Sequence, residues 1–116
     1  MSSSKSRFDD FKSEREELNE KMLSYSDKNM KRFLSLDSAI YKDGELSRKT
    51  KELMGLVAST VLRCDDCISY HLGTCDSEKV TDRELIEAFD IALMVGGSIT
   101  IPHIRRALDM WDCMKE

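Results

Sequence analysis

The sequence predicts a single all-α domain: two observations support the all-α class, and the chain length supports one domain. Apolar residues recur at the three- and four-residue intervals of a helix, whereas the alternating pattern of a half-buried strand is nearly absent. The chain has one proline and five glycines, too few for the many turns of an all-β protein. Its 116 residues are close to the usual length of one domain. We therefore expect a single domain, 1–116, built as a bundle of about six helices.

The first two expected helices are rich in charged residues. One covers about residues 5–24, and its few apolar positions fall at helical spacing: Phe8, Phe11, Leu18 and Met22. The next covers about 27–41, with Lys42-Asp43-Gly44 as its exit and turn. Because the first helix has a narrow apolar side, we expect it to pack on a partner subunit rather than to form an independent unit.

The third and fourth expected helices lie in the middle of the chain. Ser47 is a candidate N-cap for a helix that continues to Leu62, and its apolar run predicts an almost wholly buried segment. Glu52 is the single acid in that run, and a buried acid requires an explanation. The fourth helix carries Cys67 and His71, and we expect it to end near Gly73.

The last two expected helices have clear start signals. The sequence Thr81-Asp82-Arg83-Glu84 is a capping-box pattern, and the helix that follows it stops at Gly96-Gly97. Pro102 fits the first turn of the sixth helix. We expect three methionines to take part in ordinary core packing: Met54, Met94 and Met110.

Composition and charge argue against several classes of protein. With 41% hydrophobic and 34% charged residues, the chain has the composition of a soluble globular protein. The net charge is -4, and the basic residues are interleaved with acids, so we expect no nucleic-acid partner. There is no run of about 18 apolar residues, so we expect no membrane span. The N-terminus is polar and lacks an apolar signal core, which makes the cytoplasm the expected compartment.

The stretch LRCDDCISYH, residues 62–71, concentrates thiols and acid-base groups. In a reducing compartment, a CxxC pair is more often metal-binding or catalytic than structural. A zinc site would use Cys64, Cys67, His71 and Cys75. On one helix, however, the first and last of these would lie about 16 Å apart, too far to enclose one ion. We therefore expect no metal, and a zinc-binding module is only an alternative.

A redox pair requires less of the chain. Cys64 and Cys67 would lie one turn apart at the start of a helix, near enough to form a disulfide. The helix N-terminus stabilises a thiolate. Asp65 and Asp66 act in the opposite direction, because a neighbouring negative charge raises the pKa of a thiol. This thiol therefore needs a base.

His71 is the candidate base, because it lies four residues after Cys67 on the same helical face. A break in the helix near Arg63 would let Glu52 fold back beside His71, where its carboxylate would orient the imidazole. Glu52, His71 and Cys67 would then form a proton relay. From the residues alone, inert core thiols in a non-catalytic helical oligomer or scaffold stay open as the alternative.

The run from Leu46 to Gly97 resembles the carboxymuconolactone decarboxylase family and, within it, the alkyl hydroperoxidase D-like branch. The matching features are Glu52, then Cys64-x-x-Cys67-x-x-x-His71 after a twelve-residue step, then the helix start at Thr81 and the pair Gly96-Gly97. On this resemblance, residues 46–97 form the family core, 5–45 the N-terminal helices and 98–116 the C-terminal helix. It implies a homo-oligomer, a trimer or a hexamer, of small all-helical subunits.

The resemblance also implies a thiol oxidoreductase. Cys67 would attack, assisted by His71 and Glu52, and Cys64 would resolve the product as an intramolecular disulfide. The substrate would be a peroxide or a disulfide, and with a disulfide the attacking thiol could instead be Cys64, which we expect to be the more exposed. Because Asp66 stands where peroxidase members often carry a histidine, the broader disulfide reductase is favoured.

Such an enzyme needs an electron donor but no cofactor besides its cysteine pair. The sequence has no Rossmann glycine fingerprint, so we expect no bound nicotinamide. Electrons would come from a thioredoxin-like protein or a low-molecular-weight thiol.

A few further residues are weaker candidates. Tyr70 is a candidate for substrate contact, with simple packing as the alternative, and Asp66 is a candidate for substrate contact or for lining the site. His103 is a candidate for lining the site from its own or a neighbouring subunit, with a solvated surface histidine as the simpler interpretation. Cys75 is expected to be a partly exposed structural cysteine, with a third redox thiol as the alternative, and Cys113 is expected to be incidental.

Arg105 and Arg106 are two further candidates, on the last expected helix. We expect them to lie on a solvated helix face. The alternatives are pairing with acids at an interface or binding of an anionic thiol substrate.

Overall fold

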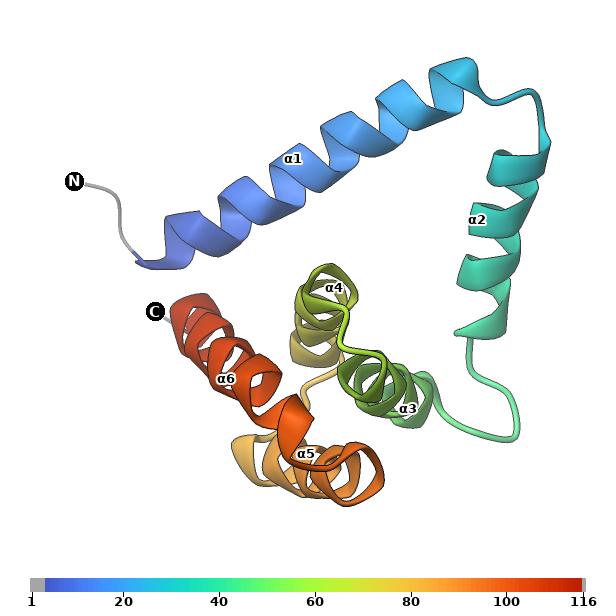
Figure 1. The fold of residues 1–116 in the computed structure, drawn as a ribbon. Helices are drawn as coiled ribbons and strands as arrows, with labels where there is room; N and C mark the ends of the chain where they lie inside the picture. The colour runs from blue at the N-terminus through green and yellow to red at the C-terminus, as the bar shows by residue number, and fades with distance from the viewer. Residues whose placement is uncertain (1–3, 116) are drawn as a thin grey trace.

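The computed structural model describes residues 4–115, which form six α-helices and one 3-10 turn (Figure 1). The elements are α1 (Ser4–Tyr25), α2 (Asn29–Ile40), α3 (Arg48–Val61), α4 (Asp65–Ser77), α5 (Asp82–Gly96), η1 (Ser98–Thr100) and α6 (Ile101–Lys115). The expected all-α fold of six helices is confirmed.

Helices α3 to α6 form the compact part of the molecule (Figure 1). Helix α3 packs against both α4 and α5, and α6 packs against α4. Their facing sides enclose one hydrophobic core, whose buried members are Leu56, Ile68, Leu72, Cys75, Val80, Leu85, Phe89, Ala107, Trp111 and Met114. The core is closed at its edge by polar contacts, since the Trp111 indole donates a hydrogen bond to Asp82 Oδ1 at 2.7 Å.

Helix α1 runs along the outside of the bundle formed by α3 to α6 and extends past it to α2, which stands to one side (Figure 1). The first part of α1 packs on α6 of the same chain, where Arg7 forms an ion pair with Asp109 and the Phe8 ring reaches the core. This part of the first helix therefore already has a place within its own subunit. In contrast, every residue of α2 is exposed or half-buried, including Phe33 at 69%.

The fourth helix does not end near Gly73, as the sequence led us to expect, but continues to Ser77. Gly73 lies within the helix because a side chain there would collide with α1: a Cβ atom would lie 2.8 Å from Phe8 Cζ. The glycine thus permits a close approach between helices and is not a stop signal.

The actual ends of α3 and α4 are Schellman motifs with lysine or arginine in place of glycine. After α3, Arg63 takes φ +61°, and Cys64 N donates to Ser59 O at 3.1 Å. After α4, Lys79 takes φ +62°, and Val80 N donates to Cys75 O at 3.0 Å. Because glycine usually occupies the left-handed position, the sequence concealed where α4 ends.

The third helix is less buried than the sequence predicts. Only Glu52, Leu56, Ser59 and Thr60 are buried, because the opposite side of α3 faces a groove. The prediction of core packing was wrong for Met54 and Met94, which are 56% and 82% exposed. It was right for Met110, which packs against the core. Apolar composition therefore did not distinguish the core side of α3 and α5 from their other side.

The start of α5 gives a direct test of how local sequence fixes this fold. The Thr81 side chain accepts a hydrogen bond from Glu84 N, and the Glu84 carboxylate accepts one from Thr81 N, so the predicted capping box is present. Replacing Thr81 with Ala should lower the free energy of unfolding by about 1 kcal/mol. Urea denaturation at fixed protein concentration measures this. Thr81→Ser retains the hydroxyl and should behave like the wild type; an equal loss in both variants would contradict the capping account.

Candidate active site

The two cysteines of the CxxC motif lie at the junction between α3 and α4. The left-handed turn at Arg63 ends α3, and Cys64 then serves as the N-cap of α4, its sulfur accepting a hydrogen bond from Cys67 N at 3.2 Å. The two residues are joined as a disulfide with a Cα–Cα distance of 5.3 Å. The pair therefore sits at the positive end of a helix, where a thiolate is stabilised.

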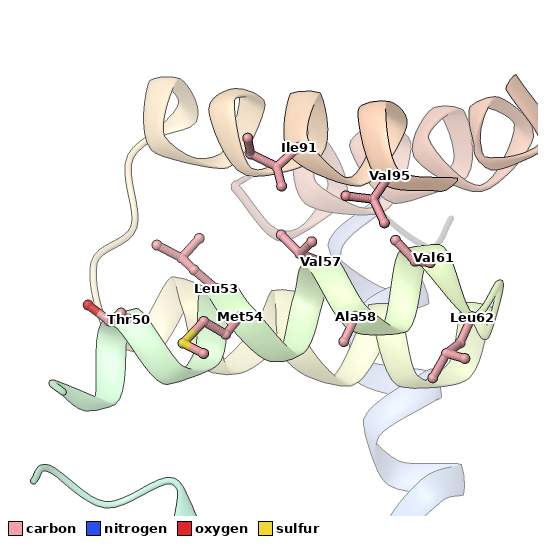
Figure 2. Close-up of a pocket in the computed structure, with 9 residues that line it drawn as sticks. All are labelled: Thr50, Leu53, Met54, Val57, Ala58, Val61, Leu62, Ile91 and Val95. Atoms are coloured by element: carbon pink, nitrogen blue, oxygen red, sulfur yellow. The ribbon is translucent and has the colours of Figure 1, made fainter. Parts of the chain in front are cut away.

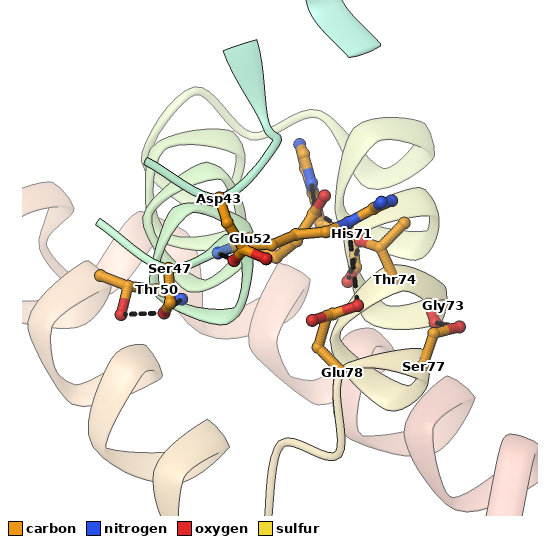
Figure 3. Close-up of polar contacts among 10 residues, drawn as sticks. Asp43, Ser47, Thr50, Glu52, His71, Gly73, Thr74, Ser77 and Glu78 are labelled. Carbon is orange, nitrogen blue, oxygen red and sulfur yellow. Dashed lines mark hydrogen bonds and ion pairs between the residues drawn. The ribbon is translucent and has the colours of Figure 1, made fainter. Parts of the chain in front are cut away.

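The break at Arg63 also turns the chain back, so that α3 and α4 lie side by side and Glu52 faces His71 (Figure 3). The His71 Nδ1 and Glu52 Oε2 atoms are 2.9 Å apart, and Glu52 is 2% exposed. The Thr74 hydroxyl donates a second hydrogen bond to the same oxygen at 2.5 Å. The buried acid thus has two partners, both on α4.

The protonation of this pair follows from its hydrogen bonds. Burial alone would raise the pKa of Glu52, but hydrogen bonds from His71 and Thr74 outweigh burial and hold the pKa below its usual value. Because an ionised carboxylate only accepts, Nδ1 of His71 carries the proton of the shared hydrogen bond. In the neutral imidazole, Nε2 is then free to accept a proton.

Two tyrosines lie against the His71 ring. Tyr70, the preceding residue, presents its ring at 5.4 Å between centroids, and Tyr41 at the end of α2 does so at 5.5 Å. Tyr70 is in turn covered by the Arg15 guanidinium of α1, 3.9 Å from the ring centroid. The imidazole therefore lies among Glu52 of α3, Tyr70 of α4 and Tyr41 at the C-cap of α2.

The thiols and His71 differ in how accessible they are. Cys67 is exposed, Cys64 is half-buried and His71 is buried, so the expectation that Cys64 is the more exposed cysteine is wrong. Cys64 is the more covered of the two because it belongs to the turn between α3 and α4. Among the hydrogen bonds of residues 4–115, none joins His71 to either sulfur, so a proton moving between them needs a water or a small side-chain movement.

The aspartates of the motif point to different partners. Asp65 accepts hydrogen bonds from His103 Nδ1 at 2.7 Å and from Arg106 Nε at 2.9 Å, which together outweigh the effect of burial and lower the pKa of Asp65. His103 is therefore not a solvated surface histidine: it links α6 to Asp65, the residue that follows Cys64 at the start of α4. Arg106 likewise pairs with an acid of its own chain, and Asp66 is exposed.

The two remaining cysteines are both buried. Cys75 is fully buried, not partly exposed as expected, because it belongs to the core between α4 and its neighbours. Burial, reinforced by the charges of Glu52 and Glu78, raises its pKa to about 12. Cys75 is therefore a protonated core residue at neutral pH, which disfavours a third redox thiol.

The described residues offer neither a metal cluster nor a membrane-spanning helix. Within residues 4–115 there is no group of three or more His, Cys, Asp or Glu side chains arranged to hold a metal ion. None of the helices in that part of the chain is long and apolar enough to cross a membrane.

The sequence did not point to Thr74, Tyr41 or Gly55 as parts of the site. Thr74 had one available signal, because it follows His71 by three residues and so shares its helical face. Tyr41 had none, since it lies more than ten residues from Glu52 and outside any motif. Gly55 follows Glu52 by three residues, but a glycine within a helix does not announce its neighbour.

Comparison with known proteins agrees with this architecture. Residues 27–110 match the model of the carboxymuconolactone decarboxylase family. A crystal structure of the Thermotoga maritima protein TM1620 is 60% identical, with a TM-score of 0.89 over 91% of this chain and 93% of that one. A second structure of that protein, at 59% identity and a TM-score of 0.87 over 91% and 90% of the two chains, is described as a family protein with a possible involvement in an antioxidative response.

More distant relatives also match most of this chain. The apo structure of lpg0406 from Legionella pneumophila, a carboxymuconolactone decarboxylase family protein, is 28% identical with a TM-score of 0.71 over 98% of this chain and 96% of that one. Uncharacterized protein 4 in the cox locus of Paracoccus denitrificans is 29% identical over 80 residues, 69% of this chain and 72% of the relative. With a family model that spans most of its length, this chain belongs to the carboxymuconolactone decarboxylase family.

Proposed function

We propose that the protein is a thiol-disulfide oxidoreductase that reduces disulfides or peroxides through Cys64 and Cys67. The observation that carries the proposal is the disulfide-forming pair at a helix N-terminus, one turn from a histidine whose Nδ1 is held by a buried carboxylate. The antioxidative response named for the Thermotoga maritima relative is consistent with this chemistry. The unit Glu52, His71 and Cys67 would act as a proton relay.

The reaction begins with the exposed thiol. His71 Nε2 takes the proton of Cys67, and the imidazolium is stabilised by the charge of Glu52. With a disulfide substrate, the Cys67 thiolate forms a mixed disulfide and releases one thiolate. Cys64, whose proton passes to the first released thiolate, then attacks the Cys67 sulfur, and the second substrate thiolate leaves and takes the proton held by His71, which leaves the Cys64–Cys67 disulfide. Two electrons have passed from the pair to the substrate.

A peroxide would follow the same route with one more intermediate. The Cys67 thiolate attacks the O–O bond, becomes a sulfenic acid and releases an alcohol after protonation. Cys64 condenses with the sulfenic acid, and water leaves. Since Asp66 is exposed and offers no second imidazole at the thiols, a disulfide substrate is favoured. In both cases a thioredoxin-like protein or a low-molecular-weight thiol would reduce the pair for the next turnover.

The experiment that tests this function follows the four thiols through one oxidation. One equivalent of peroxide or of a small disulfide, added to the reduced protein, should convert Cys64 and Cys67 to an intramolecular disulfide detected by mass spectrometry. Either serine substitution, Cys64→Ser or Cys67→Ser, should abolish the disulfide, whereas Cys113→Ser, a change at a buried cysteine away from the pair, should not. Unmodified thiols would support the inert-thiol alternative and sink the proposal.

A homo-oligomer, a trimer or a hexamer, is part of the same proposal, and exposed apolar surface supports it. The α2 helix presents Met30, Phe33, Leu36 and Ile40, each at least 48% exposed. A groove of about 670 Å³ between α3 and α5 is lined almost entirely by apolar side chains, including Val57, Val61, Ile91 and Val95 (Figure 2). Large unpartnered apolar patches of this kind mark protein interfaces.

This assembly makes a prediction about mass. The wild-type protein should sediment at three or six times the 13.3 kDa of one chain. Phe33→Glu should shift it toward the monomer, because the new charge would have to be buried in the interface. Arg83→Glu, a charge change at an exposed residue of α5, is the control and should leave the mass unchanged. A monomeric wild type at micromolar concentration would rule the assembly out.

A further inference from the structure

We propose that Tyr41 is a positioning residue for the thiol chemistry. Its hydroxyl would hydrogen-bond with Nε2 of His71, either directly or through one bridging water. This inference rests on the proposed function and assigns a part in it to the segment that follows α2. It concerns a residue that lies outside the CxxC motif and outside α3 and α4.

The first observation is a notch at Gly55 that the two side chains share. A Cβ atom built on Gly55 would lie 2.6 Å from Tyr41 Oη and 3.0 Å from His71 Nε2, with His71 Cε1 at 2.7 Å. The phenol oxygen and Nε2 therefore converge on the same small space, which exists only because residue 55 has no side chain. Two polar atoms around one point can share a hydrogen bond or a bridging water.

The second observation is that the chain on both sides of Tyr41 is anchored to α3. The Lys51 ammonium donates hydrogen bonds to the carbonyls of Ile40 at 2.8 Å and Lys42 at 2.7 Å, the two neighbours of Tyr41. Asp43 Oδ1 accepts a hydrogen bond from Arg48 N at 2.7 Å (Figure 3). Although α2 itself is exposed along its length, its end is thus held firmly beside the imidazole.

The third observation is that the two ring nitrogens of His71 have different partners. Glu52 occupies Nδ1, so Nε2 is the nitrogen that gains the proton when Cys67 is deprotonated. A hydroxyl can donate to neutral Nε2 and can accept from Nε2–H once the imidazolium forms. The bond to the charged form is the stronger of the two, so Tyr41 favours the state that follows proton transfer.

The proposed role requires that the Tyr41 hydroxyl keep its proton at neutral pH. Burial, and after it the negative charge of Glu52, raises the pKa of Tyr41, so its hydroxyl keeps its proton at neutral pH. The polar and charged groups around the two rings come from four helices: Arg15 over Tyr70, Asp37 near Tyr41, Glu52 with Arg48 on α3, and Tyr70 with Thr74 on α4.

The notch is also open to water. Tyr41 and Gly55 line a recess of about 430 Å³ together with Ile40, Leu46, Lys51, Met54 and Ala58. Apart from Tyr41 and Lys51, the side chains that line the recess are apolar, so a water that reached Gly55 would find its polar partners in the Tyr41 hydroxyl and the adjacent His71 Nε2.

The test measures the rate of alkylation of Cys67 as a function of pH. Every variant carries Cys64→Ser, so that Cys67 is the only exposed thiol. With Tyr41→Phe, the imidazolium loses a partner, and the midpoint of the rate profile should rise by about one pH unit, which makes alkylation roughly tenfold slower below both midpoints. Tyr25→Phe makes the same change at a tyrosine 86% exposed and should leave the midpoint in place.

A second variant disturbs the position of Tyr41 without changing the Tyr41 or the His71 side chain. Lys51→Met removes the ammonium that anchors the neighbours of Tyr41 and should move the midpoint in the same direction by a smaller amount. A midpoint unchanged by Tyr41→Phe, while His71→Ala moves it, would overturn the role of Tyr41 and leave the proposed function standing. If His71→Ala also leaves it unchanged, the relay itself is wrong.

Discussion

The buried carboxylate of Glu52 is the constraint on which the rest of the site depends. An ionised acid with 2% exposure is unfavourable unless its oxygens are hydrogen-bonded, and here both donors, His71 and Thr74, come from the next helix. The requirement is mutual, since the carboxylate fixes which nitrogen of His71 carries the proton. The hydrogen bond between Glu52 and His71 therefore does two things: it holds α3 against α4, and it prepares the imidazole to act as a base.

The turn at Arg63 makes that packing possible and also places the thiols. A left-handed residue ends α3, and the chain reverses within a few residues so that Cys64 becomes the cap of α4. The same short segment thus orients Glu52 toward α4 and puts the CxxC pair at the positive end of a helix dipole. The backbone of this turn therefore sets the position of the two sulfurs relative to the Glu52–His71 pair, and no direct hydrogen bond between His71 and a sulfur is among those of residues 4–115.

Much of this arrangement could be predicted from the sequence, because its signals are local. The Thr81 capping box and the turn after Tyr41 both depend on residues within one helical turn. The facing of Glu52 and His71 followed from a single assumption, that the chain reverses between them. These are contacts that periodicity and spacing can express.

What the sequence concealed depends on contacts between distant elements. Gly73 looked like a helix end but makes room for Phe8, and Lys79 ends α4 without the glycine that usually marks such a turn. The apolar residues on both sides of α3 could not reveal which side faces the core. The sequence could not predict that Tyr41 belongs to the site for the same reason. Its position beside His71 is set by Lys51 and Gly55 on α3 and not by any neighbour in sequence.

The central claim is that Glu52 acts on Cys67 through His71, and a double-mutant cycle tests it most directly. The alkylation rate of Cys67 at pH 7 would be compared among four proteins, the parent, Glu52→Gln, His71→Ala and the double variant, all carrying Cys64→Ser. We expect Glu52→Gln to slow the reaction by about tenfold or more when His71 is present and to have no further effect when it is absent. Equal slowing by Glu52→Gln in both backgrounds would show that the carboxylate acts independently of the imidazole and would contradict the account.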